Sequence, residues 1–187
     1  MAIPGGIRAV LFDRDGTLVV DVPYNGDPAR VRPMPGAVAA VRRARAAGLD
    51  VGVVSNQSGI GRGLLTPAQV EAVNVRVDEM VGPFDVWAFC PHTAADGCGC
   101  RKPAPGLVLR ACEALGVDPA EVVVIGDIAA DGGAARAAGA RSVLVPTPAT
   151  RAEEIAEAEE VASDLLAAVE LVVRGLPLPA ETEAAPR

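Results

Sequence analysis

IRAVLFDRDGTL, residues 7–18, is an apolar run that leads directly into two aspartates and a glycine. A strand that is apolar on both sides is expected inside a sheet that is covered on both faces. Gly16 lets the backbone turn sharply just after the acidic residues. Residues two apart in extended backbone point the same way, so we expect the carboxylates of Asp13 and Asp15 to face one spot. Two carboxylates at one spot require a cation between them or a proton on one of them.

Apolar runs of the same kind recur four times along the chain, as VGVVS (51–55), VWAFC (86–90), VVVIG (122–126) and SVLVP (142–146). Ala-rich segments with helical periodicity separate these runs. Strands that alternate with helices predict a doubly wound α/β fold, with a mainly parallel sheet and helices on both faces. In such folds, ligands bind at the carboxyl ends of the strands.

Proline or a capping residue marks the start of the predicted helices, and most of them end before a glycine. They cover residues 37–47, 67–80, 103–115 and 131–138. Residues 151–173 also have helical periodicity, with a short strand predicted around Val161. No repeat or linker divides the chain, so we predict one domain over residues 1–175. Residues 176–187 are rich in Pro and Glu and are predicted to form a frayed tail.

The composition is that of a soluble globular protein. Of the 187 residues, 50% are hydrophobic and 22% are charged. The net charge of −7 argues against nucleic acid or an anionic membrane as a partner, because both require a basic surface. The N-terminus does not resemble a signal peptide, and no apolar run reaches the roughly 18 residues of a membrane span. We therefore predict a cytoplasmic protein, and a monomer rather than an oligomer.

A second acidic pair follows the fourth apolar run, in the segment GDIAAD. If the first and fourth strands are neighbours, Asp127 and Asp131 lie near the first pair of aspartates. Such an oxygen-rich site suits Mg²⁺, which prefers carboxylate, carbonyl and water ligands. Each aspartate taken alone is more simply explained as a turn residue or a helix cap. The two patterns together favour a functional site.

Four separated motifs occur in order: DRDGTL (13–18), SNQS (55–58), RKP (101–103) and GDIAAD (126–131). In this the chain resembles the haloacid-dehalogenase-like (HAD-like) phosphohydrolases. The forms DRDGT, NQSGIGRG and CPH…CGCRKP are similar to the branch that contains D-glycero-D-manno-heptose 1,7-bisphosphate phosphatase and histidinol-phosphate phosphatase. The resemblance implies a Mg²⁺-dependent phosphatase that converts a heptose 1,7-bisphosphate to heptose 1-phosphate, in nucleotide-heptose biosynthesis.

The resemblance also implies roles for individual residues. Asp13 is the expected nucleophile, which forms an aspartyl-phosphate, and Asp15 is the expected general acid. Asp13, the backbone carbonyl of Asp15 and Asp127 are the expected Mg²⁺ ligands. Ser55 and Lys102 are expected to bind the phosphoryl oxygens and to stabilise the transition state. Without the resemblance, Ser55 is equally well a turn residue, and Lys102 a surface lysine.

A loop over residues 90–100 contains three of the four cysteines and the only histidine. Three thiolates and one imidazole match a closed, structural zinc site with the ligands Cys90, His92, Cys98 and Cys100. The spacing C-x-H-x₅-C-x-C is not that of the common zinc fingers, but the resemblance adds that related phosphatases carry zinc on this pattern. A disulfide from Cys98 to Cys100 or to Cys90, or free thiols, are the alternatives. The fourth cysteine, Cys112, is predicted to be a small core residue.

The substrate site is predicted to be open, because no gap between the motifs is long enough for a large cap domain. Zinc would fix the positions of the two cations that follow Cys100 directly, namely Arg101 and Lys102. Arg62 either binds a second phosphate or is solvated. Relatives often carry Lys where this chain has Ile128, which bears on substrate choice. The predicted substrate contacts, besides Ser55 and Lys102, are Asp21, Tyr24, Asn56, Gln57, Ser58 and Arg101.

Three other functions remain open at this point. Histidinol phosphate carries a cationic amine, which the acidic Asp21 suits. A non-enzymatic zinc-stabilised binding module would tolerate the loss of Asp13, Asp15 or Lys102, yet all three are present. A phosphatase of nucleic-acid ends would need a basic groove, which the composition does not indicate.

Overall fold

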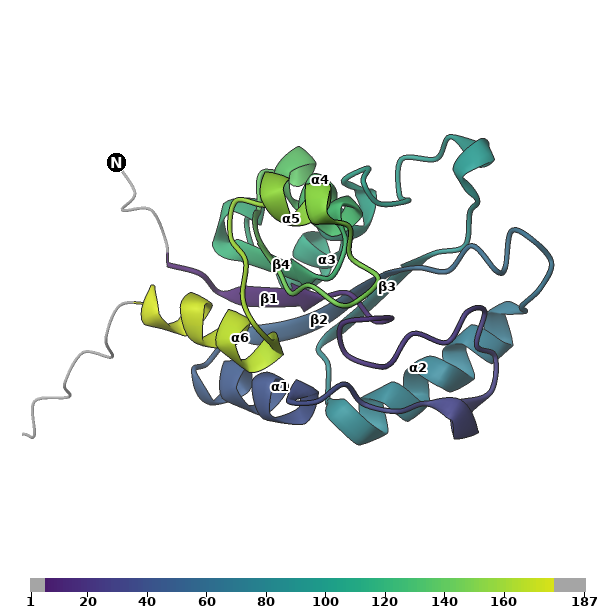
Figure 1. Cartoon of the computed structure of the whole chain (residues 1–187), viewed down its shortest axis with the longest axis horizontal. Coiled ribbons are helices and arrows are strands. Elements are labelled where there is room, and N and C mark those ends of the chain that lie inside the picture. Colours follow the sequence, from purple (N-terminus) through teal and green to yellow (C-terminus); the bar gives the residue numbers. More distant parts are fainter. Residues whose placement is uncertain (1–5, 177–187) are drawn as a thin grey trace, which may run out of the picture.

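The sheet has five strands and matches the predicted fold class. The computed structural model describes residues 6–176. The strand order is β3-β2-β1-β4-β5, and all neighbouring strands run parallel (Figure 1). The predicted neighbourhood of the first and fourth strands is thereby confirmed. The strands are β1 (Ala9–Phe12), β2 (Asp50–Asn56), β3 (Val86–Cys90), β4 (Val122–Gly126) and β5 (Arg141–Leu144).

Helices cover both faces of this sheet. Figure 1 shows α1, α2 and α6 on one face and α3, α4 and α5 on the other. Three short 3-10 helices lie in the connections: η1 (Pro28–Arg30), η2 (Ala94–Asp96) and η3 (Pro119–Glu121). The α-helices are α1 (Ala37–Ala46), α2 (Pro67–Val81), α3 (Gly106–Leu115), α4 (Ala129–Ala138), α5 (Ala152–Glu157) and α6 (Leu165–Arg174).

The central strand β1 is apolar at every position because its side chains are buried on both faces of the sheet. Val10 and Phe12 pack into the core formed with α1, α2 and α6, whereas Ala9 and Leu11 pack into the core formed with α3 and α4. All four residues are completely buried. Because successive side chains of a strand point to opposite faces, a strand between two helix layers must be apolar at every position.

Helix α3 begins at Gly106, three residues later than the sequence predicts. The side-chain amide of Asn56 accepts a hydrogen bond from the backbone N–H of Lys102 and donates one to its carbonyl, both at 3.1 Å. Gly106 also donates to the carbonyl of Gly99 at 2.9 Å. These contacts hold residues 101–105 in turns that face the carboxyl edge of the sheet, so they do not join the helix.

The C-terminal part of the chain contains two helices where the sequence predicts one periodic segment. Leu144 donates to the carbonyl of Glu160 and accepts from the N–H of Ala162, and this bridge at Val161 separates α5 from α6. The short strand predicted around Val161 is thereby confirmed as a single bridge. Helix α4 begins at Ala129, two residues earlier than predicted, because the Asp131 carboxylate accepts from the N–H of Ile128.

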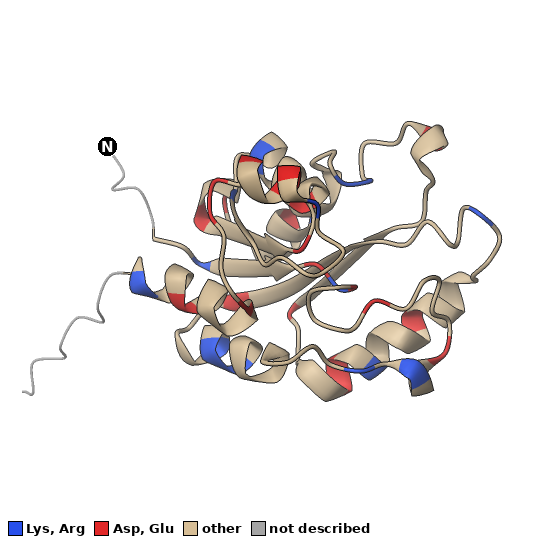
Figure 2. Ribbon diagram, viewed as in Figure 1, with Lys and Arg blue, Asp and Glu red and all other residues tan. Residues whose placement is uncertain are grey.

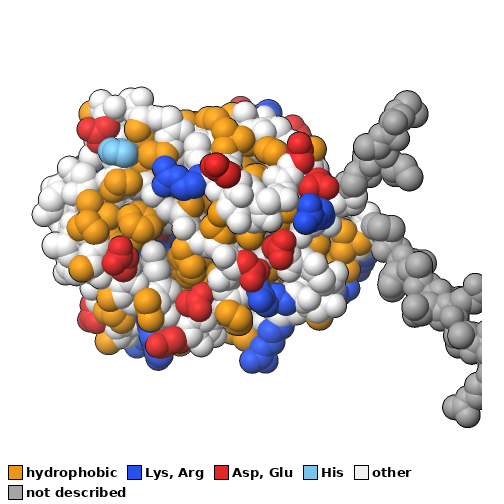
Figure 3. All heavy atoms as spheres, turned by 180° about the vertical axis from the view of Figure 1, so that it is seen from behind, with side chains coloured by type: hydrophobic (Ala, Val, Ile, Leu, Met, Phe, Trp, Pro, Cys, Tyr) orange, Lys and Arg blue, Asp and Glu red, His pale blue; other side chains and the backbone are white. Residues whose placement is uncertain are grey.

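Between β1 and α1 the described chain has η1, turns and two isolated β-bridges, in agreement with the prediction of a fold without a large cap domain. Within residues 6–176, no helix is long and apolar enough to cross a membrane. Acidic and basic residues are interspersed along the ribbon in Figure 2, and their side chains are interspersed over the face shown in Figure 3. Apart from Leu176, the predicted frayed tail lies outside the described residues.

Candidate active site

The four sequence motifs meet at the carboxyl edge of the sheet. They follow β1, β2, β3 and β4, whose parallel arrangement brings their carboxyl ends to one side of the molecule. An open cavity of about 350 Å³ lies at this edge. Nine of the predicted site residues line it: Asp13, Asp15, Asp21, Tyr24, Ser55, Asn56, Gln57, Ser58 and Asp127.

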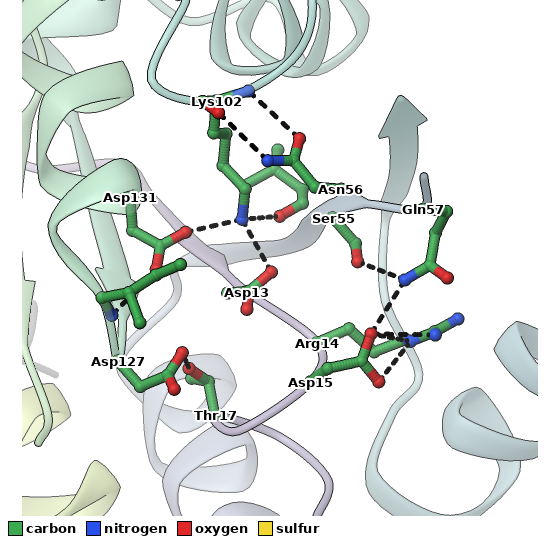
Figure 4. Close-up of polar contacts among 12 residues, drawn as sticks. Asp13, Arg14, Asp15, Thr17, Ser55, Asn56, Gln57, Lys102, Asp127 and Asp131 are labelled. Atoms are coloured by element: carbon green, nitrogen blue, oxygen red, sulfur yellow. Dashed lines mark hydrogen bonds and ion pairs between the residues drawn. The ribbon is translucent and has the colours of Figure 1, made fainter. Parts of the chain in front are cut away.

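Three carboxylates form a buried cluster at this edge. Oxygen atoms of Asp13, Asp127 and Asp131 lie within 4.8 Å of one another, and each residue is at most 7% exposed. The ammonium of Lys102 donates to Asp13 at 2.7 Å, to Asp131 at 2.6 Å and to the carbonyl of Val54 at 2.8 Å (Figure 4). When all three carboxylates are ionised, one ammonium leaves two negative charges without a partner, and a divalent cation would neutralise them. The predicted convergence of carboxylates from β1 and β4 is confirmed.

The buried setting alters the protonation of the cluster. Burial, opposed by Lys102, raises the pKa of Asp13 to about 8. Burial and the neighbouring charge of Asp131 raise the pKa of Asp127 to about 7. Burial alone would lower the pKa of Lys102, but the Asp13 and Asp131 carboxylates together raise it. Lys102 is therefore a permanent cation, whereas Asp13 and Asp127 hold protons more firmly than ordinary aspartates do, and a bound metal ion would displace these protons.

Asp15 does not point at the same spot as Asp13, so this part of the sequence prediction is wrong. The extended backbone ends at Phe12, and the chain turns through residues 13–16. Asp15 instead accepts hydrogen bonds from Arg14 at 2.9–3.2 Å and from Nε2 of Gln57 at 2.8 Å. Its carboxylate is outside the buried cluster but still lines the cavity (Figure 4).

The turn after Asp15 requires a glycine. Gly16 has a φ of +83°, and a side chain at this position would collide with the Asp127 carboxylate. The next residue, Thr17, donates from Oγ1 to Oδ1 of Asp127 at 3.5 Å. The DGT segment therefore brings the β1 and β4 loops into direct contact.

The end of β2 contributes three polar side chains. Gln57 donates from Nε2 to Oγ of Ser55 at 2.8 Å, which leaves the Ser55 hydroxyl hydrogen available for another acceptor. Both ends of the Asn56 amide bind the backbone of Lys102. Asn56 therefore holds Lys102 in position, in addition to lining the cavity.

Of the remaining predicted contacts, Asp21 and Tyr24 line the cavity and Arg101 does not. Tyr24 is 47% exposed, and its ring lies so close to Gly59 that a side chain at that glycine would contact it. Burial, followed by the charge of Asp15, raises the pKa of Asp21. The Arg101 guanidinium instead donates to the carbonyl of His92 at 3.4 Å.

The structure brings the predicted thiol and imidazole ligands together. Sγ of Cys100 lies 3.1 Å from that of Cys90 and 3.3 Å from Nδ1 of His92. Sγ of Cys98 lies 3.6 Å from that of Cys90 and 3.5 Å from that of Cys100, far beyond the roughly 2.05 Å of a disulfide bond. Both disulfide alternatives are therefore wrong for this structure, where all four cysteines are free and Cys112 is buried. Separations of this size are close to the edge of roughly 3.7 Å of a tetrahedral zinc site.

The Cys/His loop also supports the loop that follows β2. Gln57 donates its backbone N–H to the carbonyl of Cys90 at 2.7 Å, and Gly61 donates to that of Pro91 at 2.8 Å. A side chain at Gly61 would press against the Pro91 carbonyl, which explains the glycine. A metal ion in the Cys/His loop would thus stabilise the loop after β2, which forms one wall of the cavity.

Several residues of the site were not among the predicted site residues. Asp131 belongs to the GDIAAD motif, but the motif does not predict its ion pair with Lys102. Arg14 is 1% exposed and binds both Asp15 and Oδ1 of Asn74, the latter at 2.7 Å. The sequence signal for Arg14 was its position between the two motif aspartates. The role of Asn74, in the middle of α2, had no local signal.

Comparisons with known proteins agree with this geometry. Residues 99–168 match a family model described as HAD-hydrolase-like. The chain is 38% identical over 143 residues to the D-glycero-beta-D-manno-heptose-1,7-bisphosphate 7-phosphatase of Pseudomonas aeruginosa, a match that covers 74% of this chain and 80% of the relative. It is 36% identical over 189 residues to the enzyme of that name from Mesorhizobium japonicum, covering 91% of this chain and 86% of the relative.

A solved structure gives the same result. The D,D-heptose 1,7-bisphosphate phosphatase of Bordetella bronchiseptica, complexed with magnesium and phosphate, superposes with a TM-score of 0.80 at 31% identity. The match covers 91% of this chain and 100% of the other. The resemblance inferred from the four motifs is confirmed, and the chain belongs to the D-glycero-D-manno-heptose 1,7-bisphosphate 7-phosphatase family of HAD-like hydrolases.

Proposed function

We propose that this protein removes the 7-phosphate of D-glycero-D-manno-heptose 1,7-bisphosphate and releases heptose 1-phosphate. The observation that carries the proposal is the buried cluster at the carboxyl edge, where Asp13 lies against Lys102 next to two further carboxylates. A nucleophile beside a fixed cation, in an open cavity, is the arrangement that transfer of a phosphoryl group requires.

The reaction proceeds in two displacements. A carboxylate oxygen of Asp13 attacks phosphorus, the bond from phosphorus to the sugar oxygen breaks, and Asp15 gives its proton to that oxygen. Asp15 then takes a proton from water, which attacks the aspartyl-phosphate and releases inorganic phosphate and free Asp13. Since the Asp15 carboxylate is outside the buried cluster, it is free to transfer protons in the cavity.

The chain's own polar groups stabilise the transferring phosphoryl group. The Ser55 hydroxyl, whose hydrogen is left free by Gln57, would donate to its oxygens, and the Lys102 ammonium, fixed against Asp13, would supply a positive charge beside them. Asp13, Asp127 and the backbone oxygen of Asp15 would hold Mg²⁺, which would offset the repulsion between the Asp13 carboxylate and the phosphate dianion.

Substrate choice is tested by phosphate release with Mg²⁺ across both anomers of heptose 1,7-bisphosphate, histidinol phosphate and other sugar monophosphates. We expect the highest kcat/KM for a heptose 1,7-bisphosphate, with ³¹P NMR showing that the phosphate on C1 remains. Arg62→Met is expected to raise KM if the distal phosphate reaches the 57–66 loop. A higher kcat/KM for histidinol phosphate would reverse the assignment, and Asp21 would then be the natural partner of its amine.

We also propose that zinc occupies the Cys/His loop, as a structural ion with Cys90, His92, Cys98 and Cys100 as ligands. The donor set and the separations among these atoms suit tetrahedral zinc, and four protein ligands leave no open position for catalysis. The role of the loop is therefore structural: it holds the backbone of residues 101 and 102 in position.

We expect about one tightly bound zinc per chain in the purified protein, measured by elemental analysis. Cys98→Ser is expected to lose zinc, to lower the melting temperature and to reduce turnover in a way that added Mg²⁺ does not restore. Cys112→Ala is the matched control, because Cys112 is buried in α3 away from the cluster. Full activity of zinc-free wild-type protein would contradict the positioning role.

The buried carboxylates make the stability of the metal-free protein depend on pH. Burial raises the folded-state pKa values of Asp13 and Asp127 to about 8 and about 7, above those of the unfolded chain. Between about pH 4 and pH 8 the folded protein therefore binds more protons than the unfolded chain, so its free energy of unfolding falls as pH rises. We expect the melting temperature in EDTA to fall from pH 5 to pH 8, and Mg²⁺ to restore it at pH 8.

The control for this pH dependence is Asp127→Asn, which removes one of the two groups. Its melting temperature in EDTA is expected to fall less steeply between pH 5 and pH 8 than that of the wild type. Wild-type and variant curves of equal slope, or a melting temperature that rises over this range, would show that the cluster does not govern the dependence.

A further inference from the structure

The turn that carries Asp127 is held from outside by residues 147–154, a segment that belongs to none of the four motifs. This segment follows β5 and leads into α5. Two of its side chains, Thr150 and Glu154, bind the backbone on either side of Ile128. Ala149, in the same segment, lines the cavity.

Thr150 binds the metal-ligand residue itself. Its Oγ1 donates to the carbonyl oxygen of Asp127 at 2.7 Å and accepts from the N–H of Thr147 at 2.8 Å. The hydroxyl therefore links the backbone of Asp127 to a turn of the next loop. The Asp127 side chain, on the other side, points into the carboxylate cluster (Figure 4).

Glu154 binds the same turn two residues later. It is 9% exposed, and its Oε1 accepts from the N–H of Ala129, the first residue of α4, at 3.0 Å. Its Oε2 accepts from the N–H of Arg151 at 3.0 Å, and the Arg151 guanidinium lies 3.2 Å away. These hydrogen bonds, that from the Arg151 side chain first, lower the pKa of Glu154 to about 2. A carboxylate at the N-terminus of α4 also interacts favourably with the helix dipole.

Residues 147–154 are anchored at both ends, so this segment can hold the turn that carries Asp127 in a fixed position. Before it, the N–H of Val145 donates to the carbonyl of Gly126 at 2.8 Å. After it, the bridge between Leu144 and Val161 ties the chain back to β5. The turn after β4 therefore cannot shift without breaking contacts to a second, independently fixed strand.

We infer that Thr150 and Glu154 are positioning residues that hold Asp127 at the metal centre and thereby set its affinity for the divalent cation. The inference rests on the proposed function in one respect, that Asp127 is a ligand of the cation. Groups that orient a metal ligand commonly change metal affinity by about 10–100-fold when they are removed. A role in helix capping alone would instead change stability and leave the affinity unaltered.

The test measures Mg²⁺ binding to the full-length zinc-loaded protein by calorimetry, without substrate. We expect Thr150→Val to weaken Mg²⁺ binding about tenfold and Thr150→Ser, which keeps the hydroxyl, to restore it. Glu154→Gln is expected to weaken binding severalfold. Glu160→Gln is the matched control, because Glu160 pairs with Arg141 in the same part of the chain and does not contact the turn.

The outcomes separate this inference from the proposed function. Wild-type affinity in both Thr150→Val and Glu154→Gln, with binding lost in Asp127→Asn, would overturn the inference. A lower melting temperature without metal, at unchanged affinity, would do the same and assign the two residues to helix capping. Weakened binding in the variants supports the inference even if the wild type hydrolyses no sugar phosphate, a result that would overturn only the proposed function.

Discussion

Asp13→Asn is expected to abolish phosphate release, with a loss of about 10⁴-fold or more in kcat. The substitution replaces the attacking carboxylate oxygen by a neutral amide and changes the volume of the side chain very little. No neighbouring carboxylate can take over the attack, because Asp131 is committed to Lys102 and Asp127 is joined to Thr17. A continuous phosphate assay at saturating Mg²⁺ measures the loss.

The fold of this variant is expected to survive. Asp13 is one of three carboxylates around a single ammonium, so asparagine removes a charge that burial disfavours. The melting temperature in EDTA at pH 8 is therefore expected to equal or exceed that of the wild type. Asp118→Asn, an exposed capping aspartate of η3, is the control and keeps full activity. Near-normal phosphate release by Asp13→Asn would rule out the aspartyl-phosphate mechanism.

Lys102→Met is expected to damage both stability and catalysis. The ammonium of Lys102 donates to Asp13, to Asp131 and to the carbonyl of Val54, and the side chain is only 2% exposed. Its removal leaves three buried carboxylates without a cation, which costs about 3–5 kcal/mol in the metal-free protein. We expect kcat to fall by about 10²–10³-fold as well, because the phosphoryl oxygens lose a fixed positive charge. Lys102 is the only lysine of the chain, so no second lysine can replace it.

A second substitution separates the two effects of Lys102. Adding Asp131→Asn to Lys102→Met removes one uncompensated charge, so we expect it to restore much of the stability but none of the activity. Arg141→Met is the control for loss of a cation, since its partner Glu160 is about one third exposed and the pair contributes little. Full activity of Lys102→Met at saturating Mg²⁺ would show that the lysine is structural only.

The sequence alone determined the layered fold and the placement of acidic residues at the carboxyl edge of the sheet. Strand positions follow from apolar runs bounded by turn residues, and these are local patterns, so the five predicted strands match the observed ones to within two residues at each end. The convergence of the acidic residues after β1 and β4 was likewise predictable, because a parallel sheet brings the carboxyl ends of its strands together. Three cysteines and the histidine lie within eleven consecutive residues, so the sequence also suggested a metal site there.

Only the tertiary structure decided which side chains pair. Lys102 lies 89 residues from Asp13 and 29 from Asp131, and their contacts depend on the order of the strands rather than on any local pattern. The turn of Asp15 away from Asp13 depends on Arg14 and Gln57, the latter 42 residues distant.

The same reason explains the contacts that hold the Asp127 turn. Thr150 and Glu154 appear in the sequence as ordinary residues of a loop and a short helix. Their hydrogen bonds reach back 23 and 25 residues, to a turn that the β4–β5 pairing brings beside them. Local periodicity specifies whether each segment becomes a helix or a strand. Which segments come into contact is determined by the burial of both faces of the sheet, and these contacts exist only once the chain is folded.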